Sequence, residues 1–211
     1  MSVSRLGARV NSEPGSTSTS QPSRAHEPES PAGSVDRIEL LGNDALVVSD
    51  GGDDEQDPVG THLLSIVLAE VPSTGAEILR EGRIELEDRS HAFNWTSRDG
   101  DLLMGLPFAR LERDARIAGA FSLVSEPVSI IEYFEMEAPG MLKYVGVLEE
   151  DHRATPPPDD CETSCFDWYG AVRPIFLDDR VFGLIGDELV EASHDGGAIR
   201  EIQRIRMRRT D

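Results

Sequence analysis

The pattern of apolar and polar residues changes at Val35, from which short apolar runs alternate with breaks rich in Gly, Asp, Asn and Pro. Residues 83–86 and 201–207 alternate apolar with polar positions, as strands do when one face of a sheet is in water. An amphipathic pattern longer than about two helical turns is absent from the sequence. The pattern therefore predicts an all-β chain. Its predicted strands are Ile38–Leu41, Ala45–Val48, His62–Val71, Glu77–Leu86, His91–Trp95, Leu102–Leu106, Ala118–Val124, Ser129–Glu135, Met141–Leu148, Val172–Leu177, Val181–Ile185, Glu188–Ala192 and Ala198–Met207.

Residues that favour tight turns separate several of these strands. Gly, Asn and Asp tolerate the backbone conformations that two-residue hairpin turns require. We therefore expect neighbouring strands to pair as antiparallel hairpins. The predicted turns are Gly42–Asp44, Ser97–Gly100, Asp178–Asp179, Gly186–Asp187 and Asp195–Gly197.

An internal repeat extends this prediction. Residues 77–85 resemble residues 141–149 when Gly82 is aligned with Gly146, and residues 198–206 resemble both. Each copy ends a group of about four predicted strands and follows a glycine-bearing turn, at Gly75, Gly140 and Gly197. Repeated four-stranded units are typical of propeller blades, although alternating strands also resemble one another by coincidence. The repeat predicts about three four-stranded antiparallel blades over residues 35–211, too few to close the usual ring.

Residues 1–34 differ from the rest of the chain. They are rich in Ser, Pro, Thr and Gly and lack apolar periodicity, which predicts a disordered tail or linker. After Arg5 and Arg9 there is no apolar run of the length of a signal peptide, but the segment resembles linkers that follow a cleaved signal or lipid anchor. We therefore expect that the biological start can lie upstream of Met1.

The negative charge is concentrated in the predicted blades. The chain carries a net charge of −20, the tail is neutral and residues 200–211 carry +3, which leaves −23 on residues 35–199. Such acidity argues against nucleic-acid binding, which needs clustered Lys and Arg. The absence of a 20-residue apolar stretch argues against an integral membrane protein. Lys143 is the single lysine among the 20 basic residues, and the others are arginines. Two alternative explanations of this excess of arginine are a GC-rich genome and adaptation to salt.

Residues 171–207 resemble the closing blade of uncharacterised bacterial and archaeal proteins with a C-terminal β-propeller domain. The resemblance rests on Arg173, Phe176, Val181–Phe182 and Gly186–Asp187, and on residues 90–95 followed by residues 102–107, which resemble the opening of an earlier blade. It covers residues 38–211 through degenerate motifs. It implies a propeller-like fold and an extracytoplasmic location. Members of the family are much longer than this chain, so the resemblance also allows a C-terminal fragment of a longer exported propeller.

Two segments contain groups that could bind a metal. The acidic loop 50–57 offers Asp53, Asp54 and Asp57 as oxygen ligands for Ca²⁺, but Thr61 stands where a calcium loop needs its final Glu, which favours a solvated loop. Cys161 and Cys165 can form a disulfide, stay free, or bind Zn²⁺ together with His152. Their spacing matches no standard zinc pattern, so we expect no resident cofactor.

Motifs of known enzyme classes are missing. The sequence contains no GxSxG, HExxH, phosphate-binding or dinucleotide-binding motif, and His91 beside Ser90 would point to the opposite face of a strand. We therefore predict a non-enzymatic binding or scaffolding module that recognises a protein or surface ligand through its blade loops, including the long loop Asp151–Asp167. A metal-assisted hydrolase with its site in the acidic loops is the alternative.

Overall fold

A computed structural model of the chain describes residues 34–51, 60–86, 92–98, 100–110, 128–137, 140–151 and 172–207. The described residues form strands and turns, which confirms the prediction of an all-β chain. The predicted tail lies outside them except for Ser34, and so does the predicted strand Ala118–Val124. The strands are β1 (Val35–Leu41), β2 (Asp44–Gly51), β3 (Gly60–Val67), β4 (Ser73–Glu81), β5 (Arg83–Glu85), β6 (Asn94–Arg98), β7 (Asp101–Arg110), β8 (Val128–Glu137), β9 (Met141–Glu149), β10 (Val172–Leu177), β11 (Arg180–Ile185), β12 (Glu188–His194) and β13 (Ile199–Arg206).

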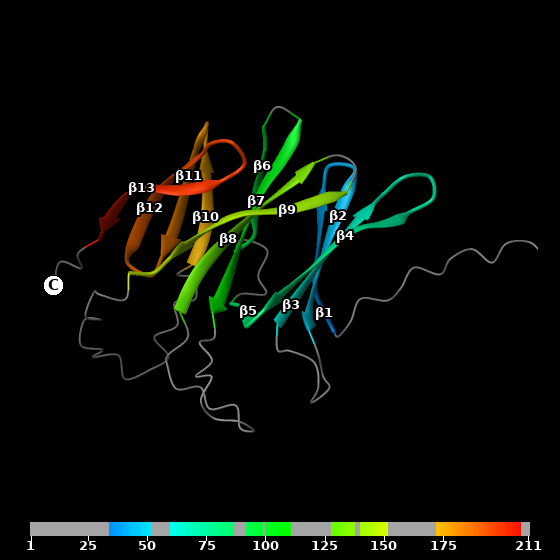
Figure 1. Cartoon of the computed structure of the whole chain (residues 1–211), viewed down its shortest axis with the longest axis horizontal. Helices are drawn as coiled ribbons and strands as arrows, with labels where there is room; N and C mark the ends of the chain where they lie inside the picture. Colours follow the sequence, from blue (N-terminus) through cyan, green and yellow to red (C-terminus); the bar gives the residue numbers. More distant parts are fainter. Residues whose placement is uncertain are drawn as a thin grey trace, which may run out of the picture.

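These strands form three antiparallel sheets in chain order (Figure 1). The first sheet contains β1 to β4, the second β5 to β9, and the third β10 to β13. In the second sheet β5 pairs with residues Phe108–Arg110 of β7, and β6 pairs with residues Asp101–Gly105 of the same strand. Together β5 and β6 therefore occupy the position of one interrupted first strand. Each sheet is therefore a meander of four strand positions, which confirms the predicted three four-stranded antiparallel units.

The first hairpin of each sheet has the same short turn. Two residues separate the paired ends Leu41 and Asp44, Arg98 and Asp101, and Leu177 and Arg180. At the third of these turns Asp178 has a φ of 51°, a left-handed conformation that Asp tolerates better than most residues. The turn residues thus place the first two strands of all three sheets in the same register relative to their turns.

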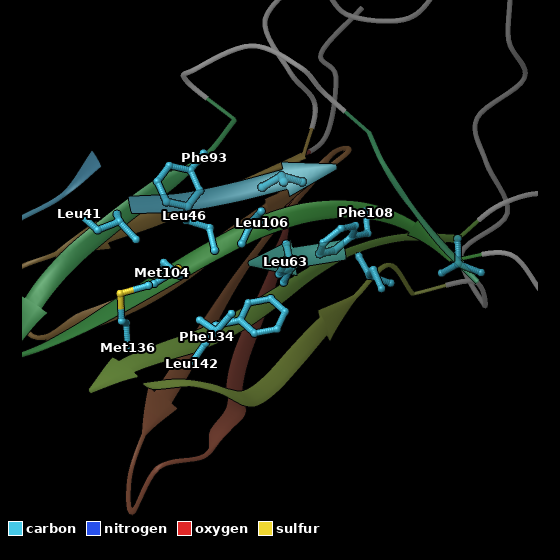
Figure 2. Close-up of a cluster of buried hydrophobic side chains, with 13 residues drawn as sticks. Leu41, Leu46, Leu63, Phe93, Met104, Leu106, Phe108, Phe134, Met136 and Leu142 are labelled. Carbon is cyan, nitrogen blue, oxygen red and sulfur yellow. The ribbon is translucent and has the colours of Figure 1, made fainter. Parts of the chain in front are cut away.

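The second sheet lies between the other two and is buried on both faces. One apolar cluster joins it to the first sheet and contains Leu46 and Leu63 from the first sheet with Met104, Phe108 and Phe134 from the second (Figure 2). Full burial of side chains of this size contributes about 1.5–3 kcal/mol each. A strand buried on both faces needs a continuous apolar run, and residues 130–134 of β8 supply one, interrupted only by a glutamate.

A second apolar cluster joins the second sheet to the third. Ile131 and Tyr133 on β8 pack against Val181 on β11 and Val190 on β12. The Tyr133 hydroxyl is buried and donates a hydrogen bond to the Phe182 carbonyl oxygen at 3.0 Å. Burial raises the pKa of Tyr133 well above its usual range, so the hydroxyl stays a neutral donor. The alternate residues of β8 therefore serve the two interfaces of the stack separately.

Glycine allows the second and third sheets to approach closely. A Cβ atom at Gly105 of β7 would lie 2.5 Å from the Cβ atom of Pro174 on β10. Carbon atoms in contact are normally separated by about 3.5–4.0 Å. Any side chain at position 105 would therefore push β10 away from the second sheet.

Three details of the sequence prediction are wrong. The predicted strand Glu77–Leu86 is divided by Gly82, whose φ of +64° turns the chain from the first sheet into the second. The predicted strand His62–Val71 ends at Val67, and Val71 is 78 % exposed in the following turn. The strand predicted at His91–Trp95 instead begins at Asn94 and runs to Arg98 as β6.

Candidate functional site: the charged end of the sheet stack

Most charged contacts of the stack lie at the end where its longer connections leave. We call this the charged end. It contains the paired termini Gly51 and Gly60, and Arg110 and Val128, together with Asp151 at the end of β9 (Figure 1, lower side). The segments 52–59, 111–127 and 152–171 continue from these residues. Loops on a rigid β scaffold commonly carry binding function, so this end is the place to look for a site.

A buried carboxylate joins the first two sheets at this end. Glu132 on β8 is fully buried, and its oxygens accept hydrogen bonds from Arg80 Nε at 2.6 Å, Arg80 Nη2 at 2.7 Å and Arg83 Nε at 2.8 Å. The hydrogen bond from Arg80 to Glu132 raises the pKa of the Arg80 guanidinium. Arg80 also lies 4.4 Å above the ring of Tyr144 on β9. The two guanidinium groups thus satisfy a charge that could not be buried alone.

A second buried carboxylate lies in the third sheet. Glu188 at the start of β12 is 2 % exposed and accepts hydrogen bonds from the guanidinium groups of Arg204 and Arg206 and, at 3.2 Å, from the Asp151 amide. Burial pushes the pKa of Glu188 up, but the hydrogen bonds from Arg206, Asp151 and Arg204 outweigh it, so the pKa lies below its ordinary value. Arg204 additionally donates to the Glu149 carbonyl oxygen at 2.8 Å, which ties β13 to β9.

An open hollow of about 490 Å³ lies beside this cluster. Val147 and Leu148 form its apolar part, and the remaining lining residues are Glu149, Glu150, Asp151, Glu201 and Arg204. Arg204 is already bonded to Glu188 and Glu201, and Arg110 binds Glu149. Among the described lining residues, four carboxylates stand against one guanidinium, so this lining is acidic and suits a ligand with positive charge.

The opposite end of the stack is tied mainly by uncharged groups. Ser65 Oγ and the Ala76 amide both donate to the Gly140 carbonyl oxygen, at 2.6 and 3.0 Å, and so join the first sheet to the second. Between the second and third sheets His194 Nε2 lies 2.7 Å from Glu135 Oε1. Each of these groups links two sheets, which is a structural role.

Within the described residues, no group of three or more His, Cys, Asp or Glu side chains is placed to hold a metal ion. Their buried carboxylates, including Glu85 beside the buried Arg37 at 2.9 Å, are each matched by a guanidinium. These buried carboxylates therefore help to hold the sheets together.

Most of the residues that the sequence singled out lie outside the described ranges. Asp53, Asp54 and Asp57 belong to the segment 52–59, and His152, Cys161 and Cys165 belong to the segment 152–171. Of the predicted recognition loop only its first residue, Asp151, is described, and it lines the hollow. The sequence analysis missed Glu132 and Glu188. A glutamate inside the apolar run 130–134 is the signal that could have pointed to Glu132.

Within the described part of the chain there is no helix long and apolar enough to cross a membrane. Comparisons of the chain with protein-family models, with curated proteins and with solved structures found no match.

Proposed function

We propose that this protein is a non-enzymatic binding or scaffolding module of the β-propeller type, which recognises a partner at the charged end of its sheet stack. The propeller assignment is supported by three four-stranded meanders stacked in chain order and by the resemblance noted above. That resemblance also favours a location in the cell envelope. The binding role is supported by the acidic hollow, which opens at Asp151 where the segment 152–171 begins.

The acidic hollow is the observation that carries this proposal. Among the described lining residues the one guanidinium, that of Arg204, is held by carboxylates within the chain, whereas Glu150 is exposed. A partner with lysine or arginine side chains therefore finds unneutralised charge there. Attraction between exposed charges is screened by salt, with a Debye length of about 8 Å at physiological ionic strength. Binding should accordingly weaken as salt is raised.

A capture experiment with matched variants tests the proposal. The immobilised chain is exposed to an extract of its source cells, beside a variant in which residues 152–171 are replaced by a Gly/Ser linker. A variant with the same replacement of residues 111–127 serves as control. We expect the first replacement to remove captured partners and the control to retain them. Unchanged capture by the first variant would overturn the proposal.

A second pair of variants separates the hollow from the connecting segment. Glu150→Gln together with Glu149→Gln removes two negative charges from the hollow without shortening the chain. We expect this double variant to capture less partner than the wild type at low salt and to show a smaller effect of added salt. Capture that is insensitive to both salt and these substitutions would contradict recognition by charge.

A further inference from the structure

The outer face of the third sheet carries a group of apolar side chains. Val181 contacts the second sheet, and Gly183 faces Ile131, so Phe182 between them points away from the stack. The same alternation and the strand register place further apolar side chains beside it. They are Ile175, Leu184, Leu189 and Ile205. A hollow of about 280 Å³ lies on this face. Its lining residues are Phe182, Leu189 and Ile205 together with Arg180, Glu191 and Gln203.

The outer face of the first sheet is apolar as well. Val47 lies between Leu46 and Val48, which both pack against the second sheet, so Val47 points away from it. Ile38 and Leu40 on β1 lie on the same outer face and are 63 % and 67 % exposed. Leu64, Ile66 and Leu79 continue this face across β3 and β4. Val47 and Leu64 are themselves buried, so Ile38 and Leu40 form the exposed apolar part of this face, as Ile205 does on the third sheet. Exposed apolar residues on two faces of one molecule indicate surfaces that associate.

A repeated position shows what the third sheet is built to contact. Equivalent positions in the three sheets are occupied by Arg37, Asn94 and Arg173. Each of them stands four residues before the strand residue that immediately precedes the two-residue turn. Arg37 Nη2 lies 2.9 Å from Glu85, on the first strand of the second sheet. Asn94 Nδ2 lies 3.5 Å from the Pro174 carbonyl oxygen, on the first strand of the third sheet. At this position the first and second sheets each direct a donor to the first strand of the next sheet.

Arg173 is the member of this series for which the described chain offers no next sheet. Its neighbours Val172 and Pro174 face the second sheet, so its side chain lies on the outer face of the third. The Arg173 Nε atom is buried and has no hydrogen-bond partner among the described residues. A buried donor without a partner costs about 1–3 kcal/mol. The Arg173 side chain as a whole is only half-buried, so it can turn toward a further first strand and give this donor a partner.

We propose that the outer face of the third sheet binds the outer face of the first sheet of a second copy of this chain. The contact continues the order already present within one chain, where the later face of each sheet packs against the earlier face of the next. It brings Arg173 to β1 of the second copy. It also brings Ile38 and Leu40 of that copy to the hollow beside Phe182.

The oligomeric state of the full chain 1–211 tests the proposal first. Light scattering coupled to size exclusion should give a mass of at least two copies of the 23.1 kDa chain, with a larger share of monomer on dilution. A monomer at all concentrations up to about 1 mM, a concentration at which even weak specific contacts form, would overturn it.

Two single-face variants then test which faces meet. Leu40→Glu damages the first-sheet face and Ile205→Glu damages the third-sheet face, and both side chains are exposed enough for the monomer to keep its fold. Each variant alone should be monomeric, whereas their equimolar mixture should form a dimer, because each chain retains one of the two complementary faces. Self-association that survives in either variant alone would indicate pairing of equal faces and overturn the proposal. Met141→Glu, a charge on an equally exposed residue of the middle sheet, is the control and should associate like the wild type.

Arg173→Leu isolates the donor. Loss of a hydrogen bond from a charged group should weaken association about tenfold or more. The thermal midpoint of the diluted monomer should stay the same or rise, since the variant removes a buried donor that has no partner within the described chain. Unchanged association would remove Arg173 from the contact.

Discussion

Glu132 provides the sharpest test of how the sheets are held together. Glu132→Gln keeps the size of the side chain but removes the negative charge between Arg80 and Arg83. Removing one partner of a buried ion pair costs about 3–5 kcal/mol, because the remaining charge stays buried. Arg80 and Arg83 are 22 % and 20 % exposed, so water can reach them in part and we expect the lower end of this range, about 3 kcal/mol. For a chain of this size that loss lowers the thermal midpoint by roughly 6–12 °C.

Equilibrium unfolding in urea, followed by circular dichroism and by tryptophan fluorescence, measures this loss. The two signals must change together for a single free energy of unfolding to be defined. Glu191→Gln is the matched control, because Glu191 also binds a guanidinium through two hydrogen bonds, those of Arg180 at 2.8 and 2.9 Å. That pair lies at the surface, so its loss should cost much less than the loss of Glu132.

A triple variant decides whether the buried charges or the shape of the cluster matter. Arg80→Met, Arg83→Met and Glu132→Leu together remove the unpaired charges and keep apolar volume at the interface. Replacement of a buried charged triad by apolar residues is often neutral or stabilising, so the triple variant should be more stable than Glu132→Gln alone. The reasoning fails if Glu132→Gln costs no more than the Glu191→Gln control, or if the triple variant is the least stable of the set.

Three further predictions concern the contacts of the third sheet. Tyr133→Phe leaves the buried Phe182 carbonyl oxygen without its 3.0 Å donor and should lower the free energy of unfolding by about 1 kcal/mol in urea titrations. In the folded chain the pKa of Glu188 lies below its ordinary value of 4.5. The stabilising effect of this carboxylate is therefore present above pH 4.5 and is lost as the pH falls through the folded pKa. Glu188→Gln should accordingly flatten the acid side of a plot of thermal midpoint against pH. Gly105→Ala forces a Cβ atom to 2.5 Å from Pro174 and should cost about 1–3 kcal/mol, with loss of near-ultraviolet dichroism before far-ultraviolet signal.

The strands and hairpins could be predicted because their signals are local. The turns at Gly42, Asp178 and Gly186 lie where Gly, Asn and Asp residues follow one another, and each is found as a two-residue turn. Alternating residues in 201–206 likewise form β13 as predicted. Turn chemistry and residue alternation depend on a few neighbouring residues, so one sequence is enough to recognise them.

The charged end of the stack could not be predicted, because its contacts join residues far apart in the chain. Arg80 and Glu132 are separated by 52 residues and meet only because β4 of the first sheet packs against the second sheet. The sequence shows 40 acidic and 20 basic residues, and their number says nothing about which ones pair. An acidic composition suggested a solvated surface, whereas Glu132 and Glu188 are among the most buried polar residues described.

The repeat is carried by the turns more than by the strands. Alignment of Gly82 with Gly146 matches Ile84 with Leu148, but Ile84 lies in the first strand of the second sheet and Leu148 in its last. Alternating strands resemble one another wherever they stand, so their similarity does not fix the alignment. Alignment at the two-residue turns instead matches Leu41 with Leu177, and with them Arg37 with Arg173. Arg37 reaches the neighbouring sheet and Arg173 has the same position, so the third sheet has the features of a sheet that packs against another.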